Sequence, residues 1–132
     1  MNNEKSTILV VEDDMSSMAL LRTILDTGSN LLEATTGAQA LSLATENKLD
    51  VVLIDLELPD ITGLEVCRRI KAMDGGESIP VLFLTAHDDI LLESQAFKAG
   101  AVDYIVKPVS PLRVLIRLNA HIKNKVPMEL LN

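Results

Sequence analysis

The sequence predicts an α/β fold in which a parallel sheet is covered by helices on both faces. Five short apolar runs alternate with longer amphipathic stretches, and each run ends in a polar or acidic residue. Such alternation is typical of βα units around a parallel sheet. The 132 residues suit one domain, and five βα units fit that length with connections of ordinary size.

The predicted strands are the apolar runs, which cover residues 7–11, 30–34, 51–54, 81–84 and 104–106. The first, third and fourth runs are apolar nearly throughout, as parallel strands are when helices cover both faces of the sheet. The second run is more polar, so we expect its strand to lie nearer an edge of the sheet.

Helices are predicted between these strands, where apolar residues recur at helical spacing. The first helix carries Met18, Leu21, Ile24 and Leu25 and ends before Gly28. The third ends at the break at residues 74–76, and the fourth ends at Gly100. The predicted caps are Thr35 or Thr36 for the second helix, Thr62 for the third, and Asp88 or Asp89 for the fourth.

The fifth helix is predicted to begin at Pro111, because proline suits the first turn of a helix. Its core stripe is predicted to comprise Leu112, Leu115, Leu118 and Ile122. Val114 and Ile116 add apolar groups outside that stripe, and we expect these groups to face a partner.

Composition excludes several classes of function. The chain has 12 basic and 19 acidic residues and a net charge of −7, so we expect repulsion from nucleic-acid phosphates and no direct nucleic-acid binding. No apolar run approaches the roughly 18 residues that a membrane span needs. The single Cys67 makes no internal disulfide, and the opening residues do not read as a basic-then-apolar signal peptide, so we expect a cytoplasmic location.

Polar residues gather where the predicted strands end. They are Glu12, Asp13 and Asp14 after the first strand, Asp55 after the third, Thr85 after the fourth and Lys107 after the fifth. Functional groups of open parallel sheets lie beyond the carboxyl ends of the strands. These residues therefore mark one candidate site.

The chemistry of this site follows from its charges. Glu12, Asp13 and Asp55 converge if the first and third strands are adjacent, and two such charges about 4 Å apart repel by about 4 kcal/mol at an effective dielectric constant of about 20. Oxygen ligands with room for water favour Mg2+ over a calcium cage or a zinc site. Lys107 adds a cation and Thr85 a hydroxyl donor, which together predict a pocket for an aspartyl phosphate.

Four separated motifs resemble the receiver domain of bacterial two-component response regulators. They are Ile8 to Asp14, Val51 to Asp60 with Gly63, Val81 to Ala86, and Ala99-Gly100-Ala101 leading to Tyr104 to Pro108. The resemblance covers about residues 6–124. It implies a flavodoxin-like (βα)5 fold whose five-stranded parallel sheet has the strand order 2-1-3-4-5.

The resemblance implies that Asp55 is the phosphoacceptor, which receives the phosphoryl group of a phosphohistidine on a sensor histidine kinase or histidine phosphotransfer protein. Asp13 is similar to the family's direct Mg2+ ligand, for which Mn2+ substitutes. Glu12 is implied to act through a metal-bound water, and Glu57 to contribute its backbone carbonyl. The domain would then be a signalling switch rather than an enzyme, with intrinsic self-phosphorylation and dephosphorylation chemistry.

Other positions are implied to handle the phosphoryl group and the switch. Lys107 resembles the lysine that pairs with a phosphoryl oxygen, and its bond to Pro108 is expected to be cis. Thr85 would donate its hydroxyl to the phosphate, while Tyr104 would change rotamer. The side chains of Glu57 and His87 would border the phosphoryl group and modulate its lifetime.

Plainer interpretations stand beside these. Asp14 is interpreted as a solvated loop acid, and Cys67 as a small core residue. A degenerate receiver that serves only as a docking scaffold is one alternative. A small α/β phosphotransfer enzyme is another, but a dehalogenase-type phosphatase normally has a second Asp where this chain has Glu57.

The chain is predicted to be a single receiver domain over residues 1–132, with residues 125–132 at the start of a linker. A homodimer is expected through the fourth helix, fifth strand and fifth helix after phosphorylation. The closing segment looks like receivers that precede cyclic dinucleotide enzymes or sit in hybrid kinases.

Overall fold

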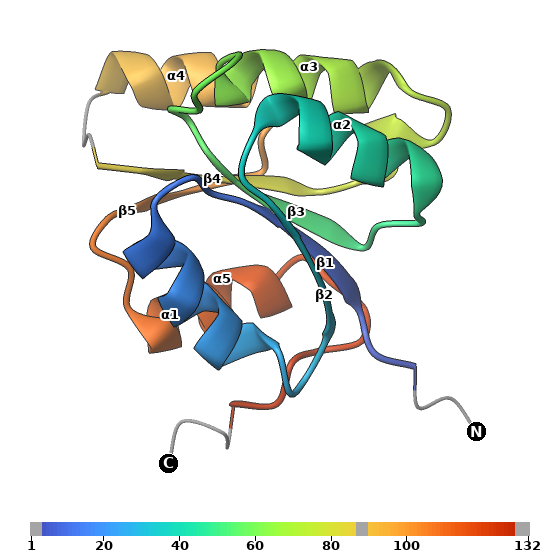
Figure 1. Cartoon of the computed structure of the whole chain (residues 1–132), viewed down its shortest axis with the longest axis vertical. Coiled ribbons are helices and arrows are strands. Elements are labelled where there is room, and N and C mark those ends of the chain that lie inside the picture. The colour runs from blue at the N-terminus through green and yellow to red at the C-terminus, as the bar shows by residue number, and fades with distance from the viewer. Residues whose placement is uncertain (1–3, 87–89, 129–132) are drawn as a thin grey trace.

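A parallel sheet runs through the centre of the part of the chain that the computed structural model describes, residues 4–86 and 90–128 (Figure 1). The strands are β1 (Thr7–Val11), β2 (Asn30–Ala34), β3 (Val51–Asp55), β4 (Val81–Thr85) and β5 (Asp103–Val106). The helices are α1 (Met15–Leu25), α2 (Gly37–Glu46), α3 (Gly63–Ala72), the short 3-10 helix η1 (Gly76–Ser78), α4 (Ile90–Lys98) and α5 (Pro111–Asn119).

The sheet has the order β2-β1-β3-β4-β5, and every pairing is parallel. The predicted fold class and strand order are therefore confirmed, as is the edge position of the second strand. Val11 of β1 pairs with Ile54 of β3, so the residues that follow these two strands emerge side by side.

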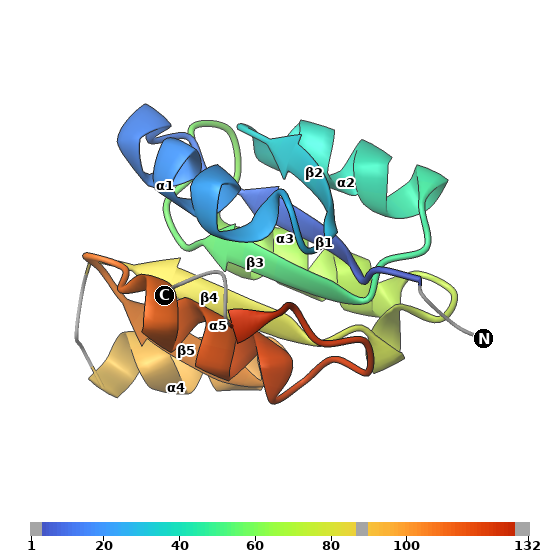
Figure 2. The same cartoon turned by 90° about the horizontal axis from the view of Figure 1, so that it is seen from below.

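Helices cover both faces of the sheet. Figure 1 shows α2, α3 and α4 on one side and α1 and α5 on the other, and Figure 2 views the α1/α5 side. Alternation along β1 explains how one strand serves both cores, because successive side chains of a strand point to opposite faces. Leu9 and Val11 pack in the cluster beneath α2–α4, whereas Ile8 and Val10 pack beneath α1 and α5.

The helix starts agree with their predicted caps wherever the structure describes them. Thr36 caps α2 and Thr62 caps α3, each accepting a bond from an N–H group three residues later. Pro111 is the first residue of α5. The predicted caps of the fourth helix, Asp88 and Asp89, lie outside the described residues.

The predicted core stripe of the fifth helix is wrong at two positions. Leu112 is 51% exposed, whereas Val114 is fully buried. The buried face of α5 is centred between Leu115 and Leu118, and at 100° per residue Val114 lies on that face while Leu112 turns away from it. Ile116, at 50% exposed, points outward as expected.

Residues 120–128 fold back over the face that carries α1 and α5. Val126 is 1% exposed and packs in that core. The side-chain amide of the buried Asn119 donates to the carbonyl of Val126 (2.9 Å) and accepts from its N–H group (2.8 Å). Ser6 adds a bond from its hydroxyl to the carbonyl of Asn124 (2.6 Å). The segment is thereby held against the domain.

Among residues 4–86 and 90–128, no helix has the length and apolar character required to cross a bilayer.

Replacing Asn119 with Ala should lower the free energy of unfolding by about 2 kcal/mol, because two backbone groups lose their buried partner. Urea unfolding followed by circular dichroism measures this. The matched control is Asn47→Ala, which removes one exposed bond to Leu43 and should cost less than about 0.5 kcal/mol. Equal losses in the two variants would contradict the docked position of residues 120–128.

Candidate functional site

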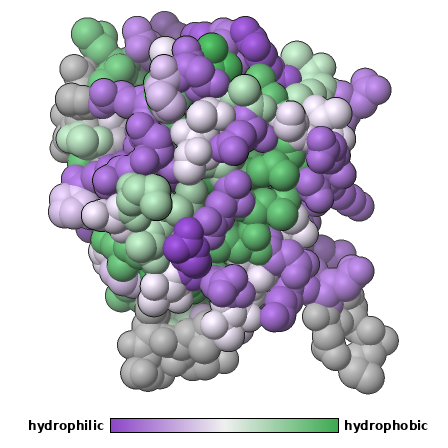
Figure 3. Space-filling model, in the orientation of Figure 1, coloured by the Kyte–Doolittle hydropathy of each residue, from purple (hydrophilic) through white to green (hydrophobic). Residues whose placement is uncertain are grey.

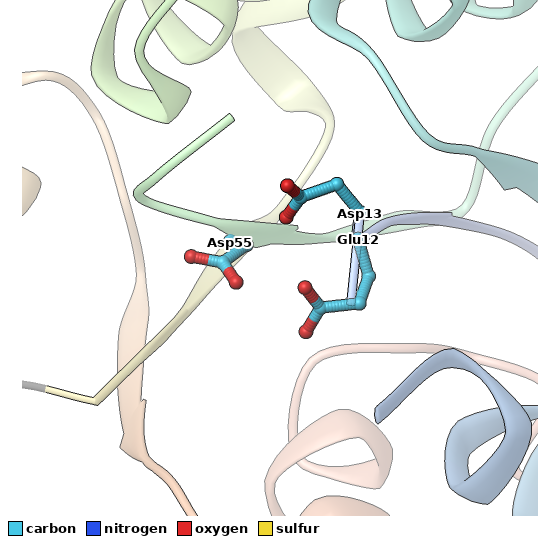
Figure 4. A group of neighbouring side chains, drawn as sticks. All are labelled: Glu12, Asp13 and Asp55. Carbon is cyan, nitrogen blue, oxygen red and sulfur yellow. The ribbon is translucent and has the colours of Figure 1, made fainter. Parts of the chain in front are cut away.

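Three carboxylates from two neighbouring strands meet at the carboxyl edge of the sheet. The side chains of Glu12, Asp13 and Asp55 offer oxygen atoms that all lie within 4.8 Å of one another, and Figure 4 shows them pointing toward a common space. The pairing of β1 with β3 places them there. The predicted convergence of these residues is confirmed.

Glu12 is the most deeply buried member of the group, with none of its surface exposed. Burial raises the pKa of Glu12, and its contact with Asp55 raises it further, whereas the bond with Lys107 opposes both. The net effect places the pKa of Glu12 at about 7. Near neutral pH this carboxyl group is therefore balanced between its charged and uncharged forms.

Lys107 supplies the cation that this acidic cluster requires. Its ammonium lies 2.5 Å from Glu12 Oε1 and 2.7 Å from Asp55 Oδ2. Burial by itself lowers the pKa of Lys107, but the bonds to Asp55 and Glu12 outweigh burial and hold that pKa above its usual value. One ammonium faces three carboxylates, so the cluster keeps an excess of negative charge.

The backbone around Lys107 is fixed by its neighbours. Its N–H group donates to the carbonyl of Thr85 (2.6 Å), which joins the end of β5 to the end of β4. The Lys107–Pro108 peptide bond is cis, as expected. The sequence did not predict the direct pairing of Lys107 with Glu12, because it assigned Lys107 to a phosphoryl oxygen and Glu12 to a metal-bound water.

Asp55 is held at both of its oxygen atoms and is 7% exposed. Oδ1 accepts a bond from the N–H group of Glu57 (2.8 Å), and Oδ2 accepts one from Lys107 (2.7 Å). Gly63 closes the β3–α3 loop behind Asp55, donating its N–H to the carbonyl of Leu56 (2.9 Å). A Cβ atom at Gly63 would lie 2.2 Å from the Asp55 carbonyl oxygen, so a side chain has no room there.

Thr85 and Tyr104 occupy the strands next to the cluster. Thr85 ends β4 and is 1% exposed, whereas the half-buried Tyr104 belongs to β5 and packs against the core beneath α2–α4. Thr85 thus lies at the same sheet edge as Asp55. Their switching roles stay predictions.

Asp14 has a role in addition to the expected one. Asp14 is exposed, as predicted, but it also caps α1 by accepting bonds from the N–H (3.2 Å) and hydroxyl (2.8 Å) groups of Ser17. Its place just before the first apolar stripe is the signal that identifies such a cap. His87, for which an effect on phosphate lifetime is expected, lies outside the described residues.

The donor set of the cluster matches one kind of ion. Glu12, Asp13 and Asp55 present only carboxylate oxygens, which hard divalent cations such as Mg2+ prefer. Such a cation would also offset the excess negative charge that Lys107 leaves. The arrangement thus combines an acidic cluster suited to a divalent cation with an ammonium bonded to two of its carboxylates.

The free Cys67 belongs to the core rather than to this site. It is buried on α3, its thiol donates to the carbonyl of Ala99 (3.3 Å), and burial raises its pKa to about 11. The interpretation of Cys67 as a small core residue is confirmed.

Known proteins match both the sequence and the fold. The family model of the response regulator receiver domain matches residues 8–119. The transcriptional regulatory protein ResD of Bacillus subtilis is 38% identical over 117 residues, covering 88% of this chain and 48% of ResD. A probable cyclic di-GMP phosphodiesterase of Vibrio cholerae is 35% identical over 125 residues, covering 95% of this chain and 28% of that protein. The chain thus spans about half, or less, of these relatives.

A solved structure of a receiver domain matches the fold. The receiver domain of the sensor histidine kinase PA1611 from Pseudomonas aeruginosa, with a magnesium ion coordinated in its active site cleft, superposes with a TM-score of 0.82. It is 27% identical, and the match covers 89% of this chain and 97% of that one. The sequence, the strand order and the acidic cluster agree, and the chain belongs to the response regulator receiver domain family.

Proposed function

We propose that this receiver domain accepts a phosphoryl group on Asp55 from a phosphohistidine, in a Mg2+-dependent reaction, and changes conformation to control an output. The observation that carries the proposal is the position of Asp55. It lies in a cluster of three carboxylates whose oxygens are within 4.8 Å of one another, and its Oδ2 is 2.7 Å from the ammonium of Lys107. The phosphate donor would be a sensor histidine kinase or a histidine phosphotransfer protein.

Asp55 is the nucleophile in this proposal. One of its carboxylate oxygens forms a bond to phosphorus while the phosphorus–nitrogen bond of the phosphohistidine breaks, and the imidazole leaves and takes up a proton. The bonds from Glu57 and Lys107 hold the carboxylate in place. Orientation of this kind is the main contribution of a protein to phosphoryl transfer.

Mg2+ would be held by Asp13, Asp55 and the backbone carbonyl of Glu57, with Glu12 acting through a bound water, and Mn2+ would substitute for it. The ion supplies positive charge that offsets the charge of the phosphoryl oxygens. The magnesium ion in the active site cleft of the PA1611 receiver supports this assignment. The carboxylate oxygens of this chain fit the same type of ion.

Three side chains would respond to the new phosphate. Lys107 exchanges part of its contact with Glu12 and Asp55 for a phosphoryl oxygen, a charge-assisted bond that suits an ammonium. The hydroxyl of Thr85 donates to a second oxygen, and Tyr104 follows by changing rotamer. The side chains of Glu57 and His87 would modulate phosphate lifetime.

Incubation with acetyl phosphate and Mg2+ should add one acid-labile phosphoryl group, because Asp55 is the only acceptor in this assignment. Intact mass spectrometry measures the addition. Asp55→Asn is the matched control, since it keeps the size of the side chain and removes the nucleophile. Chelation of the metal should also abolish the gain, and labelling of the Asn variant would contradict the assignment of Asp55.

The affinity for Mg2+ should rise with pH, because a proton on Glu12 competes with the cation. The pKa of Glu12 is about 7, so the group loses its proton as pH rises through that value and the cluster gains negative charge. Affinity at pH 6 should be about tenfold weaker than at pH 8, as isothermal titration calorimetry measures. Glu12→Gln should flatten this dependence; a wild-type affinity that does not vary with pH would contradict it.

A homodimer is proposed through α4, β5 and α5 after phosphorylation. Helices α4 and α5 carry exposed apolar side chains. The exposed fraction is 81% for Ile90, 71% for Leu91, 45% for Phe97, 51% for Leu112 and 50% for Ile116. Figure 3 shows hydrophobic side chains at the upper left, where Figure 1 draws α4. Large exposed apolar patches commonly mark interaction surfaces.

Phosphorylated protein should therefore sediment as a dimer at micromolar concentrations, while unphosphorylated protein sediments as a monomer. Ile116→Asp should prevent dimerisation, because it places a charge in the apolar surface. Leu20→Asp is the matched control, since Leu20 is a partly exposed residue of α1. A phosphorylated wild type that stays monomeric would contradict the proposed surface.

We further propose that residues 6–124 form the core of a single receiver domain in a cytoplasmic protein. The family match over residues 8–119 supports that core. Residues 125–132 would lead from the domain toward an output region, and the first part of this segment, which includes Val126, is docked on the core. The matches to ResD and to the probable cyclic di-GMP phosphodiesterase of Vibrio cholerae, each much longer than this chain, support an output carried by a longer polypeptide.

A further inference from the structure

The first turn of α2 is bonded to a residue far from it in the sequence. The carboxylate of Asp60, in the β3–α3 loop, accepts a bond from the N–H group of Gly37 at Oδ1 (2.8 Å) and from that of Ala38 at Oδ2 (2.9 Å). The next two N–H groups of the helix bond to the hydroxyl and the carbonyl of Thr36 (3.1 Å each). The N–H groups of Gly37, Ala38 and Gln39, which a helix leaves without intrahelical partners, are thereby satisfied. The bond of Ala40 to the carbonyl of Thr36 is the first regular bond of the helix.

The charge of Asp60 suits this position. Bonds from the N–H groups of Gly37 and Ala38 hold the pKa of Asp60 below its usual value. A negative charge at the amino terminus of a helix is also favoured by the helix dipole. Asp60 is therefore fixed at both oxygen atoms although it is exposed.

A second contact reinforces the same junction. Ile61, the neighbour of Asp60, lies so close to Gly37 that a Cβ atom built there would be 2.5 Å from its Cγ1 atom. Ile61 also packs against the core beneath α2–α4. The middle of the β3–α3 loop is therefore held to α2 by two polar bonds and by apolar packing.

This loop carries backbone groups of the candidate site. It begins at Asp55, and the N–H group of Glu57, three residues before Asp60, bonds to Asp55 Oδ1 (2.8 Å). Gly63 closes the far end of the loop through its bond to Leu56 (2.9 Å). The two ends of the loop are thus fixed at β3 and α3, and the two bonds of Asp60 join its middle to α2.

We propose that Asp60 is a positioning residue, which holds the β3–α3 loop to α2 so that the backbone of Glu57 stays aligned with Asp55. The inference rests on the proposed function, in which the carbonyl of Glu57 binds Mg2+ and Asp55 accepts the phosphoryl group. The amino terminus of α2 thereby becomes a support for the phosphorylation site. Loss of Asp60 would loosen the loop without touching any residue of the acidic cluster.

A pair of variants separates this role from ordinary helix capping. Asp60→Ala removes the two bonds to α2 and releases the loop, whereas Thr36→Ala removes a cap from the same helix and leaves the loop bonded. Both variants should lose stability in urea unfolding, because each leaves N–H groups of α2 unpaired. Only a positioning role predicts a difference between them at the phosphorylation site.

The first measurement is amide hydrogen exchange of Glu57 in metal-free protein, under conditions where all variants are folded. Exchange should be faster in Asp60→Ala than in the wild type and unchanged in Thr36→Ala. The second is Mg2+ affinity by calorimetry, which should fall about tenfold in Asp60→Ala, a loss typical of supporting residues around metal sites, and by less than twofold in Thr36→Ala. Asp60→Asn keeps one acceptor oxygen and should restore part of both properties.

The two hypotheses fail in different ways. If the wild type binds no Mg2+ and gains no phosphoryl group, the proposed function is wrong, whereas faster exchange of Glu57 in Asp60→Ala would still support the tether. If the wild type behaves as proposed but Asp60→Ala matches Thr36→Ala in exchange and in Mg2+ affinity, Asp60 is only a helix cap and the inference is overturned.

Discussion

The buried contact of Lys107 with Glu12 and Asp55 is the interaction on which the site depends. Each carboxylate is within 2.7 Å of the ammonium, and without that cation two acidic groups would face each other where little water reaches them. Removing one partner from a buried ion pair is costly because the other charge is left uncompensated. The third carboxylate, Asp13, leaves the cluster short of positive charge, and that deficit is what suits it to a divalent cation.

Geometry at this site follows from the way the sheet is enclosed. Residues Ile8 to Val11 of β1 and Val51 to Ile54 of β3 are fully buried between the two layers of helices, so the residues at the carboxyl ends of these strands have little freedom to move. The β3–α3 loop then adds precision: Gly63 lies against the carbonyl of Asp55, and Asp60 bonds to the first turn of α2. The buried strands and the fixed loop thus hold the carboxylates close together although their charges repel.

Local patterns in the sequence predicted much of this arrangement correctly. Thr62 was identifiable as a cap, and Thr36 as one of two candidates with Thr35, because a cap bonds only three residues away. The stripe of α5 was misassigned at Leu112 and Val114, because several apolar residues in one helix allow more than one face and only packing against the sheet selects between them. The bonds of Asn119 to Val126 left no signal, since neither residue belongs to a recognisable motif.

The sequence by itself therefore determined which segments form strands, which residues cap the helices and which residue types lie at the site, because these depend on residues a few positions apart. Contacts between residues far apart in the sequence were decided only by the tertiary structure, and they include the bonds of Lys107 with Glu12 and of Asp60 with Gly37. The burial and contacts of Glu12 also raise its pKa to about 7. The physical reason is that hydrogen-bond geometry and burial depend on which elements pack together. A carboxylate in the sequence is only a potential ligand, whereas its partners and its exclusion from water set the pH at which it becomes charged.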